Sequence, residues 1–478
     1  MRLLTLSSYV PSLRQPLHLF TTSTRASLLA VVLWVATLFG EKIPRLASLR
    51  LVAILVLVLL VIAVRQSRYT VIVAVCLSGA AGGAAAWAAP HSEAVASCSG
   101  VARLQSDPAP LFGGAQVILN MNGVRWKSLA HGMAASRLAR RSAGEFVAVR
   151  GTCSPLRGEY SRSEYVRHIV GAMSVEEVSE VFGEGAIVMR TANRMRSAMQ
   201  SGVAGMDAEK KSLFTGLVIG DDRLQPRDMV QRFRDSGLSH LCAASGQNVA
   251  YLLAVIAPFV RRRSVRVKWL VTMGVIGWFI VLTRGEPSVL RAGFMAAAVA
   301  TNSLRRTAMN ARVVLALSVM ILLLVDPMLA WSVGFALSVG ATAGLAWLSA
   351  PLGRLCGGRG VLASTLAAQM GTFPISLMVF GSVPVVSLVA NPLALPVAGA
   401  VMTVGLPVSL FAAMFPGLVG LVSTLMSIPV AWVDAVAMVA SRISPTGGVN
   451  SALWLVVAVW VFQRWRSKRG ERLTAVAG

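Results

Sequence analysis

The sequence has little charge for its length, and acidic residues are especially few. Only 14% of the 478 residues are charged, against roughly 25% in ordinary soluble domains. Lysine and arginine number 45 against 20 aspartates and glutamates, giving a net charge of +25, while 55% of the residues are hydrophobic. Because a soluble fold has no comparable interior in which to hide so much apolar surface, this composition excludes an ordinary soluble globular protein.

The sequence also lacks the patterns of two enzyme classes. Its five histidines include no His-x-His pair, so a histidine-rich metal cluster of that kind is not expected. It has no G-x-x-x-x-G-K-[ST] segment, which argues against ATP hydrolysis at a phosphate-binding loop. We therefore expect no metal, no cofactor and no enzymatic activity.

The sequence contains many long apolar runs. A helix that spans a bilayer needs roughly 20 apolar residues. The runs are Ala26–Gly40, Leu51–Val64, Tyr69–Pro90, Ser239–Val260, Trp269–Leu282, Ser288–Asn302, Val313–Val325, Leu329–Leu348, Val361–Phe380, Val386–Phe411, Leu418–Val439 and Ala452–Phe462. They predict a mainly α, polytopic integral membrane protein of about twelve helices, located in the plasma membrane.

Basic clusters between the runs predict its orientation. If the N-terminus is cytoplasmic and each run crosses once, the clusters near residues 65, 262, 306, 356 and 468 all lie in the cytoplasm. Lys42, Arg45 and Arg50 are the exception. This loop bias explains most of the positive charge, with a polyanion partner or anionic lipid as alternatives. Both termini are then cytoplasmic and residues 94–238 are extracellular.

The outer segment begins like a small β-domain. Gln116–Leu119, Arg125–Ser128 and Phe146–Val149 are short strand-like runs separated by turn signals. Cys98 and Cys153 bracket this region in an oxidising compartment, so a disulfide is predicted, with two free thiols as the alternative. The expected divisions are 1–93 (N-terminal membrane helices), 94–158 (β-domain), 159–212 (amphipathic helix and linker), 213–465 (second membrane block) and 466–478 (basic cytoplasmic tail).

Basic residues of the outer segment are accompanied by one aromatic residue. Single-stranded nucleic acid is held by positive charge along its backbone and by base stacking on aromatic rings. The candidate contacts are Arg125, Trp126, Lys127, Arg140 and Arg141. On composition alone a solvated surface face is the simpler interpretation.

Polar residues occur in the second membrane block where apolar ones are expected. Such groups have to face protein or water, which predicts a broken or re-entrant helix lining an aqueous vestibule. In one interpretation Glu286 and Arg291 form a structural ion pair, and in the other Arg291 contacts a passing phosphate. The candidate vestibule residues are Asp221, Ser239, His240, Ser245, Gln247, Asn248, Glu286, Arg291, Asp326, Gln369 and Asn391.

An ordered set of motifs resembles the competence domain of the ComEC family. The motifs are Gly220/Asp221, Ser239–Leu241 with Ser245/Gly246, Pro287–Ala292, Asp326/Pro327 with Gly334–Ser338, and Pro374 through Pro396. They lie within Leu213–Trp465, about half of the chain. Ser97–Pro155 is similar in position and strand pattern to the extracellular OB-type domain of that family.

The resemblance implies an inner-membrane channel that passes single-stranded DNA into the cytoplasm during natural transformation. It implies a DNA receptor and a separate nuclease outside, and a cytosolic helicase or single-strand-binding protein inside. The oligomeric state is left open. Two other classes stay possible: a small-solute or lipid-linked transporter on the same helices, and an intramembrane hydrolase using Ser245 with His240, which lacks the Gly-x-Ser-x-Gly context.

The chain departs from the family in three places. Asn248 and Ala336 stand where many members have His and Gln, so a role for a titrating imidazole at position 248 is not carried over. Many members continue into a metallo-β-lactamase-like domain, which is not expected here because the sequence ends at Gly478.

Overall fold

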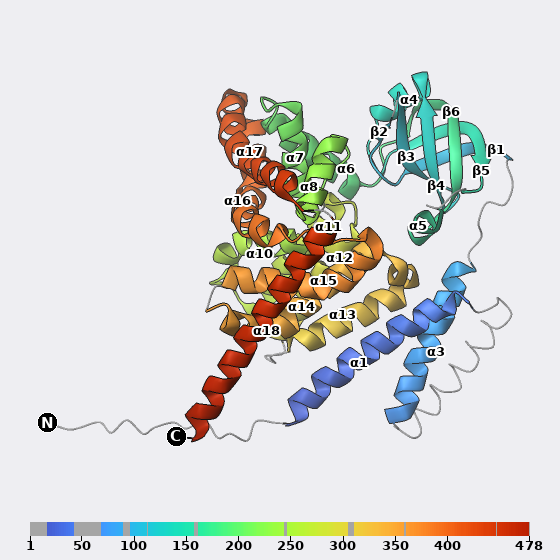
Figure 1. The fold of residues 1–478 in the computed structure, drawn as a ribbon. Coiled ribbons are helices and arrows are strands. Elements are labelled where there is room, and N and C mark those ends of the chain that lie inside the picture. The colour runs from blue at the N-terminus through green and yellow to red at the C-terminus, as the bar shows by residue number, and fades with distance from the viewer. Residues whose placement is uncertain are drawn as a thin grey trace.

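The computed structural model describes residues 17–42, 68–88, 96–111, 113–156, 161–242, 246–304, 310–357, 360–445 and 447–477. Within them the chain forms a β-barrel and a larger helical unit, with two N-terminal helices alongside (Figure 1). The predicted run Leu51–Val64 and the vestibule candidate Ser245 lie outside the described residues.

Five strands close into the barrel: β1 (Ala96–Leu104), β3 (Gly114–Met121), β4 (Val124–His131), β5 (Phe146–Ser154) and β6 (Ile169–Gly183). They pair in the order β1-β5-β6-β4-β3, and β3 pairs back with β1. The β4–β6 pair is parallel and the other pairs are antiparallel. The short strand β2 (Ala109–Leu111) adds to β3, and helix α4 (Gly132–Ala139) packs on β3, β4 and β6. This five-stranded closed barrel fits the expected OB-type domain.

The predicted strands lie within β3, β4 and β5, and their residue pattern explains why. Along β3 every second side chain is buried, as a strand with one face on a core requires. Asn122 and Gly123 connect β3 to β4 with φ angles of 54° and 81°. Positive φ at both central residues is the signature of a tight hairpin turn, for which Asn-Gly is the preferred pair.

The predicted boundary at residue 158, and the helix and linker expected over 159–212, are wrong in part. After helix α5 (Ser161–Val166), β6 runs to Gly183 and completes the barrel, and helix begins only at Ile187. The register of β6 against β5 shifts beside Glu177, so Val175 and Val178 are both buried at a spacing of three. A β-bulge of this kind gives a strand the apolar spacing of a helix.

The helical unit follows the barrel. Its helices are α6 (Ile187–Gly202), α7 (Ala208–Ile219), α8 (Arg227–Asp235), α9 (Ser239–Cys242), α10 (Gly246–Val260), α11 (Val265–Leu282), α12 (Pro287–Leu304), α13 (Ala311–Val325), η1 (Pro327–Trp331), α14 (Val333–Leu355), α15 (Gly360–Phe380), α16 (Ser387–Met414), η2 (Pro416–Leu418), α17 (Val419–Ile443) and α18 (Gly447–Ala477). The N-terminal helices are α1 (Leu17–Gly40) and α3 (Arg68–Trp87).

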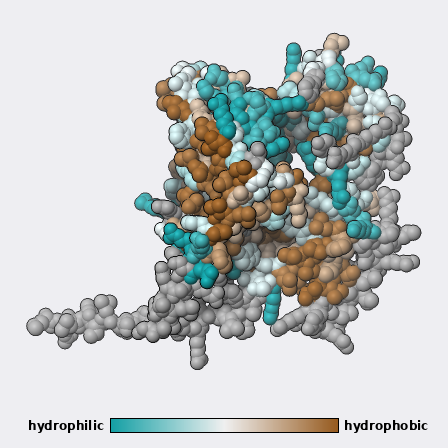
Figure 2. Space-filling view, in the orientation of Figure 1, coloured by the Kyte–Doolittle hydropathy of each residue, from teal (hydrophilic) through white to brown (hydrophobic). Residues whose placement is uncertain are grey.

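Six helices are long and apolar enough to cross a membrane. These segments are Ser23–Gly40, Val265–Leu282, Val333–Leu355, Gly360–Phe380, Ser387–Met414 and Pro416–Ile443, with three shorter apolar helices besides. Apolar side chains gather over much of the helical unit, while hydrophilic ones gather at the top of the view over the barrel and neighbouring helices (Figure 2). This distribution suggests a membrane protein; a total of about twelve spans and the orientation of the termini stay predictions.

The segment predicted as a linker belongs to the core of the helical unit. Helix α6 lies so close to α16 that a Cβ at Gly202 would be 1.8 Å from the carbonyl oxygen of Ser409. Phe214 of α7 is fully buried and lies against Gly405 of α16. Because only three residues separate the end of β6 from the start of α6, the barrel is directly connected to this core.

Candidate functional site

Five charged residues meet where the barrel joins the helical unit, and we call them the arginine–aspartate cluster: Asp107, Arg196, Asp221, Arg223 and Arg284. Asp107 comes from the loop between β1 and β2. Arg196 comes from α6, Asp221 and Arg223 from the loop after α7, and Arg284 from the loop between α11 and α12. The cluster therefore ties one barrel loop to three parts of the helical unit.

Within the helical unit, Asp221 is fully engaged. Its carboxylate accepts two hydrogen bonds from Arg223, both of 2.7 Å, and one of 2.6 Å from Arg196. Gly220 has a φ of 70° and ends α7 in the left-handed conformation that glycine favours, which turns the chain sharply before Asp221.

On the barrel side, Asp107 accepts two hydrogen bonds from Arg284. Arg284 Nη2 lies 2.8 Å from Oδ1 and Nε lies 3.1 Å from Oδ2 of Asp107. Arg196 and Arg223 approach the same carboxylate at 3.3 and 3.7 Å. The backbone N–H of Ala143 also donates to Asp107 Oδ1. Arg284 itself has a φ of 61°, a left-handed conformation that is uncommon for a residue other than glycine.

Electrostatics keep both aspartates ionised. Burial would raise the pKa of Asp107, but the guanidinium groups of Arg196, Arg284 and Arg223 hold that pKa below its usual value. Burial acts on Asp221 in the same direction, and Arg223 and Arg196 likewise hold its pKa low. A buried charge without its partner costs about 3–5 kcal/mol, so each member of the cluster depends on the others.

A second contact joins barrel and helical unit at the vestibule candidate Asp326. His168, in the loop before β6, lies 3.0 Å from the Asp326 carboxylate, which also caps η1 through the N–H of Met328. The candidate Glu286 is exposed in the loop before α12. Asp221 and Asp326 thus both lie at the junction with the barrel.

Arg291 lies inside the helical unit with neutral partners. It is 6% exposed, and it donates to Ser338 Oγ at 2.7 Å and to Thr342 Oγ1 at 2.9 Å, both on α14. It forms no ion pair with Glu286 or with another carboxylate of the described residues. A Cβ at Gly246 would lie 3.0 Å from Arg291 Nη2, so the guanidinium lies against the start of α10.

The start of α10 carries two further candidates. Asn248 is buried and donates to the carbonyl of Leu217 on α7, while Gln247 donates to the hydroxyl of Tyr251. Asn248 therefore links α10 to α7. Helices α9 and α10 are separate elements around undescribed residues 243–245, so the proposed break in one helix stays a prediction.

Candidates from α15 and α16 form another group. Gln369 donates to Ser387 Oγ, and Asn391 lies one turn further along α16 with a buried side-chain oxygen that has no hydrogen-bond partner in the described residues. A Cβ at Gly237 would lie 2.6 Å from that of Ser387, so the chain leading to α9 packs beside this group. Ser239 and His240 are exposed on α9.

The outer-domain candidates do not share one face. Side chains alternate along β4, so Trp126 packs on the barrel core while Lys127 pairs with Glu164 of α5 and Arg125 donates to the carbonyl of Arg167. Arg140 and Arg141 lie apart from them, after α4. Stacking and backbone contact at this site would therefore come from different sides of the strand.

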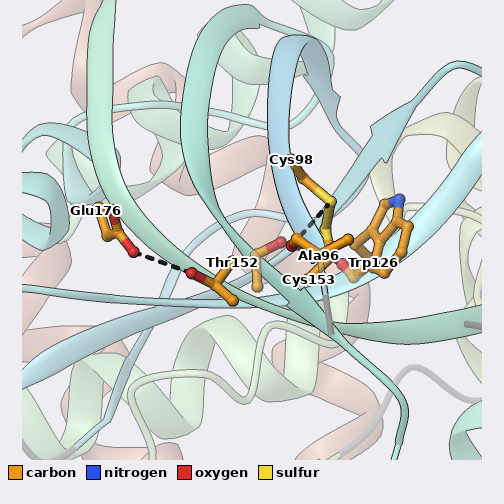
Figure 3. Close-up of a disulfide and its surroundings, with 7 residues drawn as sticks. Ala96, Cys98, Trp126, Thr152, Cys153 and Glu176 are labelled. Atoms are coloured by element: carbon orange, nitrogen blue, oxygen red, sulfur yellow. Dashed lines mark hydrogen bonds between the residues drawn. A yellow bond between two sulfur atoms is a disulfide. The ribbon is translucent and has the colours of Figure 1, made fainter. Parts of the chain in front are cut away.

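The predicted cysteine pair is bonded. Cys98 of β1 and Cys153 of β5 form a disulfide beside Trp126 (Figure 3). Cys153 lies on the fourth barrel strand rather than the last, because β6 follows it. Within the described residues, no group of three or more His, Cys, Asp or Glu side chains could hold a metal ion.

Sequence reasoning found one member of the arginine–aspartate cluster, Asp221, and missed the other four. The candidates instead fall into groups at the barrel junction, around Arg291, and around Gln369. Asp107 and Arg284 are 177 residues apart, and no local spacing signals that they meet. The available signal was weak: acidic residues are scarce in this chain, so each one beside an apolar segment was a candidate partner for an arginine.

Comparison with known proteins gives two matches. The family model described as Competence protein matches residues 217–468, more than half of the chain. The chain is also similar to ComE operon protein 3 of Bacillus subtilis (strain 168), with 27% identity over 191 residues. That match covers 39% of this chain and 24% of the relative, so it spans about a quarter of the relative's length. No solved structure matches.

Proposed function

Because this chain belongs to the competence protein family, we propose that it is the membrane channel through which a single DNA strand enters the cytoplasm in natural transformation. Membership of the family and similarity to a ComE operon protein support a role in DNA uptake. The channel is the finer proposal. The barrel receives DNA at the outer face, and the strand passes between the helices beside the start of α10.

The environment of Arg291 carries this proposal. A charge inside a bilayer costs about 2.5–3.5 kcal/mol on insertion scales and is normally paired or hydrated. The hydroxyls of Ser338 and Thr342 orient the Arg291 guanidinium without neutralising it. Its positive charge is therefore available to a phosphate, which arginine binds through two parallel hydrogen bonds.

Passage through such a channel requires other proteins. A receptor delivers DNA, a separate nuclease removes one strand outside, and a cytosolic helicase or single-strand-binding protein draws the other inward. We propose that this chain has no enzymatic activity of its own. Purified protein should then neither cut DNA with added Mn²⁺ or Zn²⁺ nor hydrolyse ATP.

Replacing Arg291 by glutamine tests the channel. The Arg291→Gln variant should reach normal abundance, leave DNA binding at the cell surface unchanged, and lower the number of transformants and the entry of labelled strand. The matched control is Arg312→Gln, because Arg312 donates to the carbonyl of Ala346 and stacks on Trp347. That environment gives it a structural role away from α10.

Three measurements separate the outcomes: abundance, surface-bound DNA and internalised strand. Normal internalisation at normal abundance in Arg291→Gln would remove Arg291 from the path. A loss of internalisation equal in both variants and proportional to protein abundance would mean that Arg291 is structural. Normal transformation in a deletion strain would contradict the function as a whole.

A further inference from the structure

We propose that Arg196, Arg223 and Arg284 form a binding site for one phosphodiester group of the incoming strand, and that the Asp107 carboxylate occupies this site until DNA displaces it. The inference rests on the proposed function and adds a second, outer phosphate site to it. All three arginines belong to the helical unit, and Asp107 is the one member of the arginine–aspartate cluster that belongs to the barrel.

The charges of the cluster fit this exchange. Three guanidinium groups contact two carboxylates, and Asp222 adds a negative charge close to Arg223. Asp221 is held by its own helical unit and already takes three hydrogen bonds. A phosphodiester carries one negative charge, as Asp107 does, so replacing one by the other leaves the charge of the buried cluster unchanged.

The donors of the cluster also fit a phosphate. Arg284 presents Nε and Nη2 to the two oxygens of Asp107, the fork arrangement that arginine uses for carboxylate and phosphate alike. Its remaining terminal nitrogen, Nη1, is buried and has no acceptor in the described part of the chain. A phosphate offers more acceptor oxygens than a carboxylate, so it can use donors that Asp107 leaves unused.

The position of Asp107 brings DNA to the site. Asp107 lies in the connection between the first and second barrel strands, β1 and β3. In OB folds this loop is one of those that bind oligonucleotides. A strand held by the loop is therefore delivered to the three arginines, at the point where the barrel meets the helical unit.

A purely structural lock is the competing explanation. Buried ion networks often hold parts of a protein together without taking part in binding. A lock by itself does not account for Arg284 Nη1, which is buried and has no acceptor in the described part of the chain. The two explanations differ in what DNA does to Asp107.

The backbone N–H of Ala143 reports the state of Asp107, because it donates to Asp107 Oδ1 at 2.8 Å. The experiment uses the full chain in lipid nanodiscs and follows hydrogen–deuterium exchange at Ala143. A single-stranded oligonucleotide should accelerate exchange there several-fold, since displacement of Asp107 leaves this N–H without its acceptor. The same oligonucleotide with an uncharged methylphosphonate backbone should leave the exchange rate unchanged.

Variants give an independent measurement by fluorescence anisotropy of a labelled oligonucleotide. Asp107→Asn removes the competing charge and should bind the strand about tenfold more tightly, with a salt dependence steeper by about 0.7, the value for one additional phosphate on a single strand. Adding Arg284→Gln to Asp107→Asn should reverse most of this gain. The control is Arg150→Gln, which removes an exposed barrel arginine paired with Glu177 and should bind like the unaltered protein.

The outcomes of the exchange and binding measurements decide between the phosphate site and a purely structural lock. Strand binding with no change in Ala143 exchange, together with unaltered affinity in Asp107→Asn, overturns the inference and leaves the proposed function standing. If Asp107→Asn does not fold, the exchange measurement on the unaltered protein decides alone. Absence of strand binding in every variant, with normal transformation in a deletion strain, overturns the proposed function and the phosphate site together.

Discussion

Buried arginines occur in two contrasting environments in this protein. In the arginine–aspartate cluster, three guanidinium groups share two carboxylates at the junction of barrel and helices. In the interior, Arg291 is held by the hydroxyls of Ser338 and Thr342. The cluster fixes a connection, and its charge is largely cancelled. Arg291 has no carboxylate partner in the described residues, so it can contact an anion directly, whereas the cluster can bind one only in exchange for Asp107.

The few acidic residues of this chain are unevenly distributed among its arginines. Its 20 acidic side chains cannot neutralise 45 basic ones. Two of them, Asp107 and Asp221, lie at the junction, where each is buried among arginines. Arg291 on α12 and Arg312 on α13 are instead oriented by neutral groups. Arg291 therefore differs from the junction arginines in having no carboxylate to displace.

The largest expected effect is at the junction. Asp221→Ala leaves Arg196 and Arg223 buried with one carboxylate fewer, so the free energy of unfolding should fall by about 3–5 kcal/mol. Arg291→Gln should cost about 1 kcal/mol, because the glutamine amide can still donate to Ser338 or Thr342. Thermal unfolding of the purified variants compares the two. Equal losses would erase the distinction between the two environments.

Within the barrel, the disulfide between β1 and β5 should have the next largest effect. Cys98→Ser should lower the free energy of unfolding by about 2–5 kcal/mol, because the bond between Cys98 and Cys153 closes a 55-residue separation in a small domain. Cys76→Ser, at a free cysteine of α3, serves as the control and should leave stability unchanged. Mass spectrometry of non-reduced peptides should find the pair linked. Alkylation of both thiols without prior reduction would rule out the bond.

In the interior of the helical unit, substitutions at Thr342 test whether its hydroxyl orients Arg291. Thr342→Val removes a hydroxyl that accepts from Arg291 and should cost about 1.5–3 kcal/mol, the range for a hydrogen bond to a charged group. Thr342→Ser keeps the hydroxyl and should behave like the unaltered protein. The measurement is thermal unfolding together with transformant number. Equal behaviour of the valine and serine variants would mean that the hydroxyl does not orient Arg291.

The smallest expected effect is the pH dependence of the stability that the arginine–aspartate cluster contributes, which changes little near neutral pH. The pKa values of Asp107 and Asp221 are lowered in the folded protein, so their contribution is present above the unfolded pKa of about 3.9 and is lost as pH falls through the folded values. The thermal midpoint difference between the unaltered protein and Asp107→Asn should stay constant from about pH 8 to pH 5 and shrink below about pH 4. A difference that shrinks between pH 8 and pH 6 would show another group in control.

Some of this architecture was predictable because it is local. The alternation of β3, the Asn-Gly turn and the apolar runs depend on neighbours in sequence, and the predicted strands were confirmed on that basis. The prediction of helix and linker over 159–212 was wrong for β6, whose bulge places the buried Val175 and Val178 three residues apart, a spacing that strands do not normally show. A break in strand register depends on the partner strand and is not visible in one segment.

The candidate site was less predictable because it is built by contacts between distant segments. Arg291 was identified because a charge in an apolar run stands out, yet its partners on α14 are ordinary hydroxyl residues. The predicted grouping of Trp126 with Lys127 ignored the alternation of β4, which turns the two side chains to opposite faces. Arg196 lies in an amphipathic helix where a solvated arginine was the natural expectation.

The pairing of Asp107 with Arg284 has a consequence for inheritance. The two residues lie 177 positions apart, in different structural units, and loss of Asp107 would leave Arg284 without a carboxylate partner among the described residues. A lineage that loses the aspartate is then under selection to lose the arginine as well, whereas a lineage that loses the arginine first keeps Arg196 and Arg223 beside the aspartate. Among descendants of this sequence, loss of the aspartate should therefore be accompanied by loss of the arginine, which couples two distant codons in that order of change.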